Sequence, residues 1–120
     1  MAAQGNTLSK VERLSGKKPI QTLLADGRWG TAGCLKYCWL VTSPGADGPL
    51  PGRILVSVPK RLFKRAIKRN LLKRRIREAY RVRKLAGVDI MFQYNSSEAA
   101  DFAAISEAVA AALEKIASAL

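Results

Sequence analysis

The sequence contains no histidine and only two cysteines among its 120 residues. Without histidine there is no imidazole acid–base chemistry, no Ser-His or Cys-His nucleophile pair, and little basis for a zinc site. Acidic residues are also few, with 9 Asp and Glu against 21 Lys and Arg, so the formal net charge is +12. No apolar run approaches the roughly 20 residues that span a bilayer. These features predict a partner that is a polyanion rather than a membrane.

The length of the chain fits one domain, and 48% apolar residues suffice for one core. The first ten residues lack the apolar segment of a secretion signal, so we expect an intracellular, cytoplasmic protein. Neither an internal repeat nor a linker divides the sequence. We therefore expect a single domain over residues 1–120, in which the polar residues 1–13 form a flexible arm.

The two cysteines, Cys34 and Cys38, lie four residues apart in an apolar run that is typical of a β-strand. In a strand, that spacing separates them by about 13 Å. A disulfide requires Cα atoms within roughly 7 Å of each other. We therefore expect two buried thiols rather than a disulfide.

Turn residues and apolar patterns divide the N-terminal half into three elements. A short helix is expected after Pro19 and should end at Gly27. Aromatic and branched residues predict strands over 34–41 and 53–58. The intervening residues 42–52 hold three prolines and three glycines and should form a loop.

The C-terminal half predicts two helices around a strand. Residues from 66 to about 84 contain no proline or glycine and suit a helix. Strict alternation over 88–94 predicts a strand, and apolar residues repeat every three to four positions over 102–120. Ser96 or Ser97 is the expected cap of this last helix. The pattern favours an α+β fold.

Almost all of the net positive charge lies in one segment. Residues 60–84 hold thirteen of the Lys and Arg residues but a single acid, Glu78, and the rest of the chain is electrically balanced. Like charges four residues apart on a helix repel by about 0.2–0.5 kcal/mol per pair. A charged run is usually a solvated helix face, but such a face would normally include acids. The run therefore favours a nucleic-acid ligand, whereas a membrane-surface helix would need bulky apolar residues opposite the charge.

Placed on a helix, this segment separates into two sides. An apolar side with Leu72, Ile76, Ala79 and Tyr80 would dock on the sheet. A second, cationic side would face the partner, and an arginine-rich helix beside an aromatic-bearing sheet suits structured RNA flanked by a single strand. The candidate RNA-binding residues are Lys60, Arg61, Lys64, Arg65, Lys68, Arg69, Asn70, Lys73, Arg74, Arg77 and Arg81.

The segment VPKRLFKRAIKRNLLKRRIREAYR, residues 58–81, resembles the signature of the bacterial ribonuclease P protein component. That signature has a basic pair after a strand, an Ala-x-x-Arg-Asn helix start, and an Arg-Glu pair before an aromatic residue. Lys60 and Arg61 match the basic pair. The helix matches at Ala66, Arg69, Asn70, Lys73, Arg74, Arg77, Glu78, Tyr80 and Arg81, and the N-terminal half matches more loosely at Leu14, Ile20, Leu24 and Gly27.

Two departures from the family pattern stand out. Leu71 replaces the second arginine of the family's Arg-Asn-Arg sequence, and Arg75 or Lys68 is the expected substitute. Ile20 and Leu24 replace first-helix aromatics that, in the family, help to line a cleft for single-stranded RNA. We therefore expect Tyr37 and Trp39 to complete a cleft with Ile20 and Leu24. Trp29 is expected in the core.

The resemblance implies a single-domain α/β sandwich with about four strands and three helices, in the order α-β-β-β-α-β-α. It also implies a left-handed strand–helix–strand crossover, against the general preference for right-handed ones. The family's reaction removes the 5′ leader from precursor tRNA, and the catalytic RNA performs it with Mg²⁺. The implied partners are therefore that RNA and precursor tRNA. The protein would be monomeric by itself, with no catalytic residue and no metal of its own.

Two other functions remain open. The same helix would serve a ribosomal or transcription-associated protein that binds nucleic acid without any nuclease. A self-sufficient nuclease would instead need clustered carboxylates for metal ions, whereas the nine acids here are scattered along the sequence.

Overall fold

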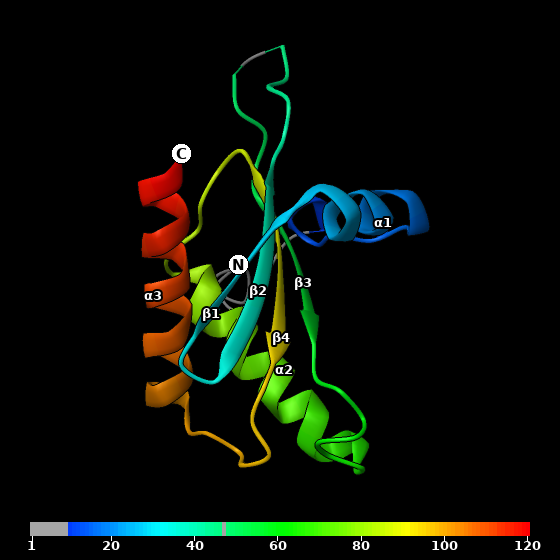
Figure 1. Cartoon of the computed structure of the whole chain (residues 1–120), viewed down its shortest axis with the longest axis vertical. Coiled ribbons are helices and arrows are strands. Elements are labelled where there is room, and N and C mark those ends of the chain that lie inside the picture. The colour runs from blue at the N-terminus through cyan, green and yellow to red at the C-terminus, as the bar shows by residue number, and fades with distance from the viewer. Residues whose placement is uncertain (1–9, 47) are drawn as a thin grey trace, which may run out of the picture.

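The computed structural model describes residues 10–46 and 48–120 as one α+β domain, which confirms the predicted fold class. A four-stranded sheet lies between α1 on one face and α3 on the other, and α2 runs along one edge (Figure 1). The elements are α1 (Lys17–Asp26), β1 (Arg28–Ala32), β2 (Leu35–Val41), β3 (Arg53–Ser57), α2 (Ala66–Arg81), β4 (Val88–Tyr94) and α3 (Phe102–Ala119).

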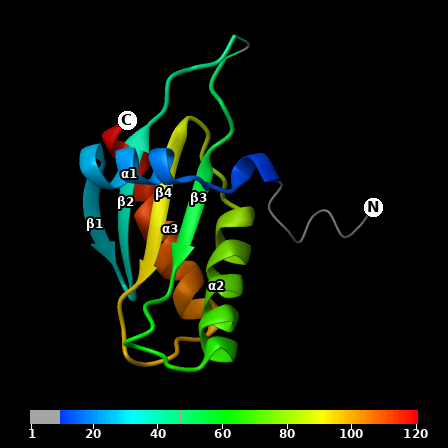
Figure 2. The ribbon, with the colours of Figure 1, turned by 90° about the vertical axis from the view of Figure 1, so that its right-hand side faces the viewer.

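The strands have the order β1-β2-β4-β3. β2 pairs antiparallel with both β1 and β4, and β3 pairs parallel with β4. The chain therefore returns from β3 to β4 through α2, whose buried residues share a core with α3. In Figure 2, β3 and β4 both run downward, and α2 carries the chain back along the α3 side of the sheet, which makes the crossover left-handed.

Successive side chains along β2 point to opposite faces of the sheet and therefore pack in two different cores. Tyr37 and Trp39 pack in the large core between the sheet and the helices α2 and α3. Cys38 faces the other way and packs with Leu23 of α1 in a smaller core. This two-sided burial follows from the period of two along a strand, and it makes β2 the centre of the domain.

The strand β1 and the position of Trp29 differ from the sequence predictions. β1 is a short edge strand whose five residues carry little apolar pattern. Trp29 lies on β1 with 48% of its surface exposed, so its prediction as a core residue is wrong. An edge strand that has one face open to solvent can carry a large aromatic side chain without burying it.

Two helix boundaries also differ. The cap of α3 is Asp101, whose carboxylate accepts a hydrogen bond from the Ala104 amide at 2.9 Å, and not Ser96 or Ser97. The Ser96 hydroxyl instead accepts from the Glu98 amide in the preceding turn. The helix α2 ends at Arg81, three residues before the end predicted from composition.

Residues 10–13, which we expected in a flexible arm, have defined positions. Lys10–Glu12 form a short 3-10 helix, and Glu12 pairs with Lys84 at 2.7 Å. Arg13 bridges to Ile54, and the amide of Leu14 donates to the Ile54 carbonyl at 2.8 Å. The rest of the expected arm, residues 1–9, lies outside the described residues.

Both cysteines are free thiols, as predicted, but only Cys38 is buried, whereas Cys34 is half-buried. Burial raises the pKa of Cys34 and of Cys38 above the ordinary value. Within the described ranges, no helix combines the length and apolar character needed to cross a membrane. The same ranges bring together no group of three His, Cys, Asp or Glu side chains that could hold a metal ion.

Candidate functional site

The apolar side of α2 is buried as predicted, which fixes the direction in which its charged side faces. Leu72, Ile76, Ala79 and Tyr80 are completely buried against the sheet and α3. Tyr80 also hydrogen-bonds the backbone of Leu85, donating to its carbonyl at 3.3 Å and accepting from its amide at 3.2 Å. The end of α2 is thus tied to the segment that leads into β4.

A glycine makes this junction possible. Gly52 is buried at the start of β3, and a Cβ at this position would lie 1.9 Å from the Leu85 carbonyl oxygen and 2.8 Å from the Tyr80 hydroxyl. Only a residue without a side chain fits there. The position of α2 along the edge of β3 therefore depends on Gly52.

The start of α2 has no acidic or hydroxyl cap. Its N-cap is Arg65, which makes no capping hydrogen bond, and the first turn contains no acid. Arg69 instead reaches back from the first turn, and its Nη1 donates to the carbonyls of Phe63 at 2.8 Å and Lys64 at 2.7 Å. Because a helix N-terminus carries partial positive charge, the cations around it are unfavourable unless an anion joins them.

All eleven candidate RNA-binding residues have side chains accessible to a partner. Within residues 10–46 and 48–120, none of the ten cations among them forms an ion pair with an acid. Arg69, Lys73 and Arg81 are half-buried, and the exposed ones are Lys60, Arg61, Lys64, Arg65, Lys68, Asn70, Arg74 and Arg77. We call the surface formed by these eleven exposed and half-buried residues the cationic face.

The fold adds one cation that the sequence analysis missed. Although Arg77 is exposed, partial desolvation by its neighbours, and then the charge of Arg13, lower the pKa of Arg77 below its ordinary value, while it remains protonated at neutral pH. Arg13 is exposed and lies some sixty residues earlier in the sequence, so only the bridge to β3 brings it here. No local sequence signal could have identified it.

Arg75, one of the two expected substitutes for the arginine that Leu71 replaces, is hydrogen-bonded to another part of the domain. Its Nη1 donates to the Ala100 carbonyl at 2.7 Å, toward the segment that precedes α3. Leu71 lies one turn before Arg75 on α2 and lines a shallow depression with Ile67 and Arg74. Lys68, the other candidate for this position, is exposed and has no hydrogen bond to another described residue, so its side chain is the freer of the two.

The face of the sheet that carries α1 is only partly covered. The strand register aligns Thr31, Lys36, Gln93 and Ser57 across all four strands on this face. Trp29 lies on the same face, and the Lys36 ammonium is 5.0 Å from the centre of its ring. These five residues form what we call the open sheet face.

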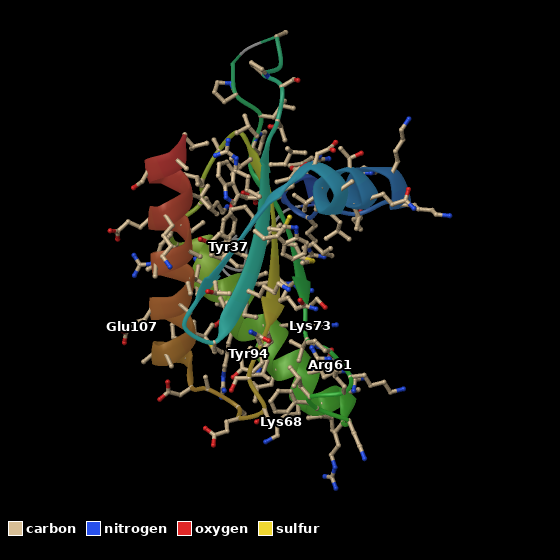
Figure 3. The ribbon with its side chains drawn as sticks, in the orientation of Figure 1. Tyr37, Arg61, Lys68, Lys73, Tyr94 and Glu107 are labelled. Atoms are coloured by element: carbon tan, nitrogen blue, oxygen red, sulfur yellow. The ribbon has the colours of Figure 1, made fainter. Side chains whose placement is uncertain are left out.

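Figure 3 relates the open sheet face to the cationic face. Arg61 and Lys73 project on the side of the sheet that α1 occupies, whereas Tyr37 and Tyr94 lie between the sheet and α3. Glu107 points away from the domain on the outer side of α3. Arg61 and Lys73 thus lie on the same side of the sheet as the open sheet face, and Glu107 lies on the opposite side.

The structure does not bring the four predicted cleft residues together. Ile20 packs against the smaller core, and Leu24 is 40% exposed on α1. Tyr37 and Trp39 are buried on the opposite face of the sheet, so the prediction that they share a cleft with Ile20 and Leu24 is wrong. Sequence alternation indicated that the two aromatics share a face, but not which face α1 would cover.

Comparisons with known proteins agree on one family. The family model for Ribonuclease P matches residues 8–117. The chain is 33% identical to the ribonuclease P protein component of Porphyromonas gingivalis, over 92% of this chain and 86% of that protein. It is 36% identical to the one from Chlorobaculum tepidum, over 66% of this chain and 52% of that protein.

Solved structures show the same fold. The RNase P protein of Staphylococcus aureus superimposes with a TM-score of 0.73 at 20% identity, covering 89% of this chain and 96% of that one. The protein from Thermotoga maritima gives a TM-score of 0.73 at 21% identity, covering 87% and 96%. At 20–21% identity, these similarities establish only a shared fold, including the order of the seven helices and strands.

Proposed function

This chain belongs to the bacterial ribonuclease P protein family and is a protein component of that ribonucleoprotein endonuclease, and from this premise we propose how its two surfaces divide the work. The cationic face binds the catalytic RNA, and the open sheet face holds the single-stranded 5′ leader of precursor tRNA. The observation that carries the proposal is a set of cations that have no acidic partner among the described residues, on a helix whose opposite side is fully buried.

Charge density is the reason for assigning the catalytic RNA to the cationic face. The cations at the start of α2, among them Lys64, Arg65 and Lys68, lie where the helix dipole already disfavours positive charge. Phosphates would relieve both the dipole and the mutual repulsion of the cations. A folded RNA supplies phosphates at fixed spacing, which suits a rigid helix better than a flexible one.

A single strand suits the open sheet face for a different reason. Unpaired bases can stack on an aromatic ring while nearby cations contact the backbone. Trp29 supplies the exposed ring, Lys36 the adjacent cation, and Gln93 and Ser57 the hydrogen-bonding groups. Leu24 and Ile20 of α1 would border this strand, so that Trp29 takes the stacking role that Tyr37 and Trp39 cannot fill.

Replacement of Trp29 by alanine tests the assignment of the leader. Stacking of one base on an aromatic side chain contributes about 1–3 kcal/mol, so the holoenzyme should bind precursor tRNA about tenfold more weakly. Affinity for mature tRNA, which has no leader, should stay unchanged. Phe102→Ala is the control, because Phe102 is similarly exposed but lies on α3. Equal loss for precursor and mature tRNA would contradict the assignment.

The chemical step is assigned to the RNA subunit with its Mg²⁺, as the family resemblance implies. This chain has no histidine, and its part is to neutralise phosphates and to hold the leader. By reducing repulsion between RNA segments, the protein would also lower the Mg²⁺ concentration that the reaction needs.

Reconstitution tests this division and also the alternative of a nucleic-acid-binding protein without a nuclease. With a bacterial ribonuclease P RNA, the purified chain should restore precursor-tRNA cleavage at a Mg²⁺ concentration where the RNA is inactive. The chain without RNA should not cleave. Robust cleavage by RNA-free protein would overturn the division of labour, and binding without restored cleavage would favour a ribosomal or transcription-associated role.

A further inference from the structure

The cationic face contains two exposed apolar side chains, and their presence is not explained by the neutralisation of phosphate charge. Ile67 is 84% exposed, more than any other large apolar side chain in the described ranges. Leu71 follows one turn later on the same side of α2 and is half-exposed. Ile67, Asn70, Leu71 and Arg74 line a shallow depression of about 330 Å³.

This depression lies on the side of α2 opposite Leu72 and Ile76, so its residues contribute nothing to the core. A solitary exposed apolar residue is ordinary, but here two lie together at the centre of a polar, charged surface. The Asn70 amide has no hydrogen bond to another described residue, and it offers both donors and an acceptor beside the apolar pair. The apolar surface of Ile67 and Leu71 suits the face of a nucleobase, and the amide of Asn70 suits the hydrogen-bonding groups at its edge.

We infer that Ile67 and Leu71 seat one unpaired nucleobase of the catalytic RNA, with Asn70 at the edge of the base and Arg74 at an adjacent phosphate. The inference rests on the proposed binding of that RNA by α2. A base inside an A-form duplex is stacked and does not present its face, so the seated base must come from a loop, a bulge or a junction. The surrounding cations favour an RNA occupant over a second protein, which would have to bring matching acids.

The proposed base-binding site of Ile67 and Leu71, which we call the seat, also gives Leu71 a function. Where the family pattern has an arginine, this chain offers an apolar surface in register with Ile67. An arginine binds a phosphate by charge, whereas a leucine gains only by covering apolar surface such as the face of a base. At this position the chain would thus recognise an RNA feature by shape rather than by charge.

A double variant, Ile67→Ser with Leu71→Ser, tests the seat in a filter-binding titration with a bacterial ribonuclease P RNA transcript. Both side chains lie outside the core, so the fold should persist, which circular dichroism checks. We expect binding to weaken about tenfold while the dependence of affinity on salt stays unchanged, because no charge is removed. Phe102→Ser on α3 is the matched control and should change affinity less than twofold.

Base-specific chemical probing of the same complex identifies the occupant. With the unaltered chain, at least one unpaired base should be protected, and that base should regain its reactivity with the double variant while the rest of the footprint persists. Unchanged affinity and an unchanged footprint would overturn the inference. If the double variant binds normally but Arg74→Ala with Arg77→Ala weakens binding, only the seat is refuted; if neither variant weakens binding, the proposed role of α2 fails as well.

Discussion

Replacement of Arg74 and Arg77 by alanine should weaken binding to a ribonuclease P RNA about a hundredfold near 0.15 M salt. Both side chains are exposed on the cationic face and have no acidic partner among the described residues. A hydrogen bond to a charged group contributes about 1.5–3 kcal/mol, and the loss of two at the lower end of this range, about 3 kcal/mol, corresponds to roughly a hundredfold. The slope of log affinity against log salt should also become shallower by about 1.4–1.8, since each phosphate contact accounts for 0.7–0.9.

The matched control removes the same charge elsewhere. Lys17 and Lys18 are both exposed at the start of α1, and Lys17→Ala with Lys18→Ala lowers the net charge equally. This pair should reduce affinity for the isolated RNA only slightly. Equal effects of the two double variants on affinity and slope would mean that the RNA responds to total charge, and the assignment of the cationic face would then be wrong.

A second large effect is expected from Gly52→Ala, on stability rather than on binding. The new Cβ would overlap the Leu85 carbonyl oxygen, which belongs to backbone that cannot simply rotate away. Overpacking of this kind costs about 3 kcal/mol, which corresponds to a fall in Tm of about 10–15 °C for a domain of this size. A thermal melt followed by circular dichroism measures it.

Gly45→Ala separates this clash from the general effect of adding a methyl group. At Gly45 the new Cβ would meet mainly the end of the Leu50 side chain, at 2.9 Å, and Leu50 is exposed and free to turn. The expected change is within about 1 kcal/mol, because a compatible glycine-to-alanine change even stabilises slightly through the unfolded state. Similar melts for the two variants would contradict a special role for Gly52.

The accessibility of the cations on α2 could be predicted from the sequence because one continuous segment carries them. The periodicity of α2 is set by local geometry, so burial of Leu72 and Ile76 could be inferred without knowing the rest of the fold. Arg13 could not be inferred in this way, because a bridge between distant segments brings it to Arg77. The role of Arg75 was hidden for the same reason, since its acceptor, the Ala100 carbonyl, lies 25 residues further along the chain. Arg69 bonds carbonyls just before the helix, and the pattern of residue types does not specify that contact.

The open sheet face was predicted poorly because it depends on how elements pack. Alternation along β2 grouped Tyr37 with Trp39, but the face that they share is decided by which helices cover it. Trp29 looked like a core residue because large aromatics usually are. It is exposed since β1 is an edge strand and α1 covers only part of this side of the sheet.

The missing cap at the start of α2 lowers the stability of the free protein but leaves room for the proposed binding of RNA phosphates. Arg65 occupies a position where aspartate or serine would stabilise the free protein by about 1 kcal/mol through the helix dipole and a capping hydrogen bond. An acid there would also place a negative charge where phosphates are expected to bind. If the start of α2 binds RNA as proposed, selection for heat resistance alone should enrich acidic residues at position 65 and yield weaker RNA binders, and the marginal helix start would be a cost of the proposed binding.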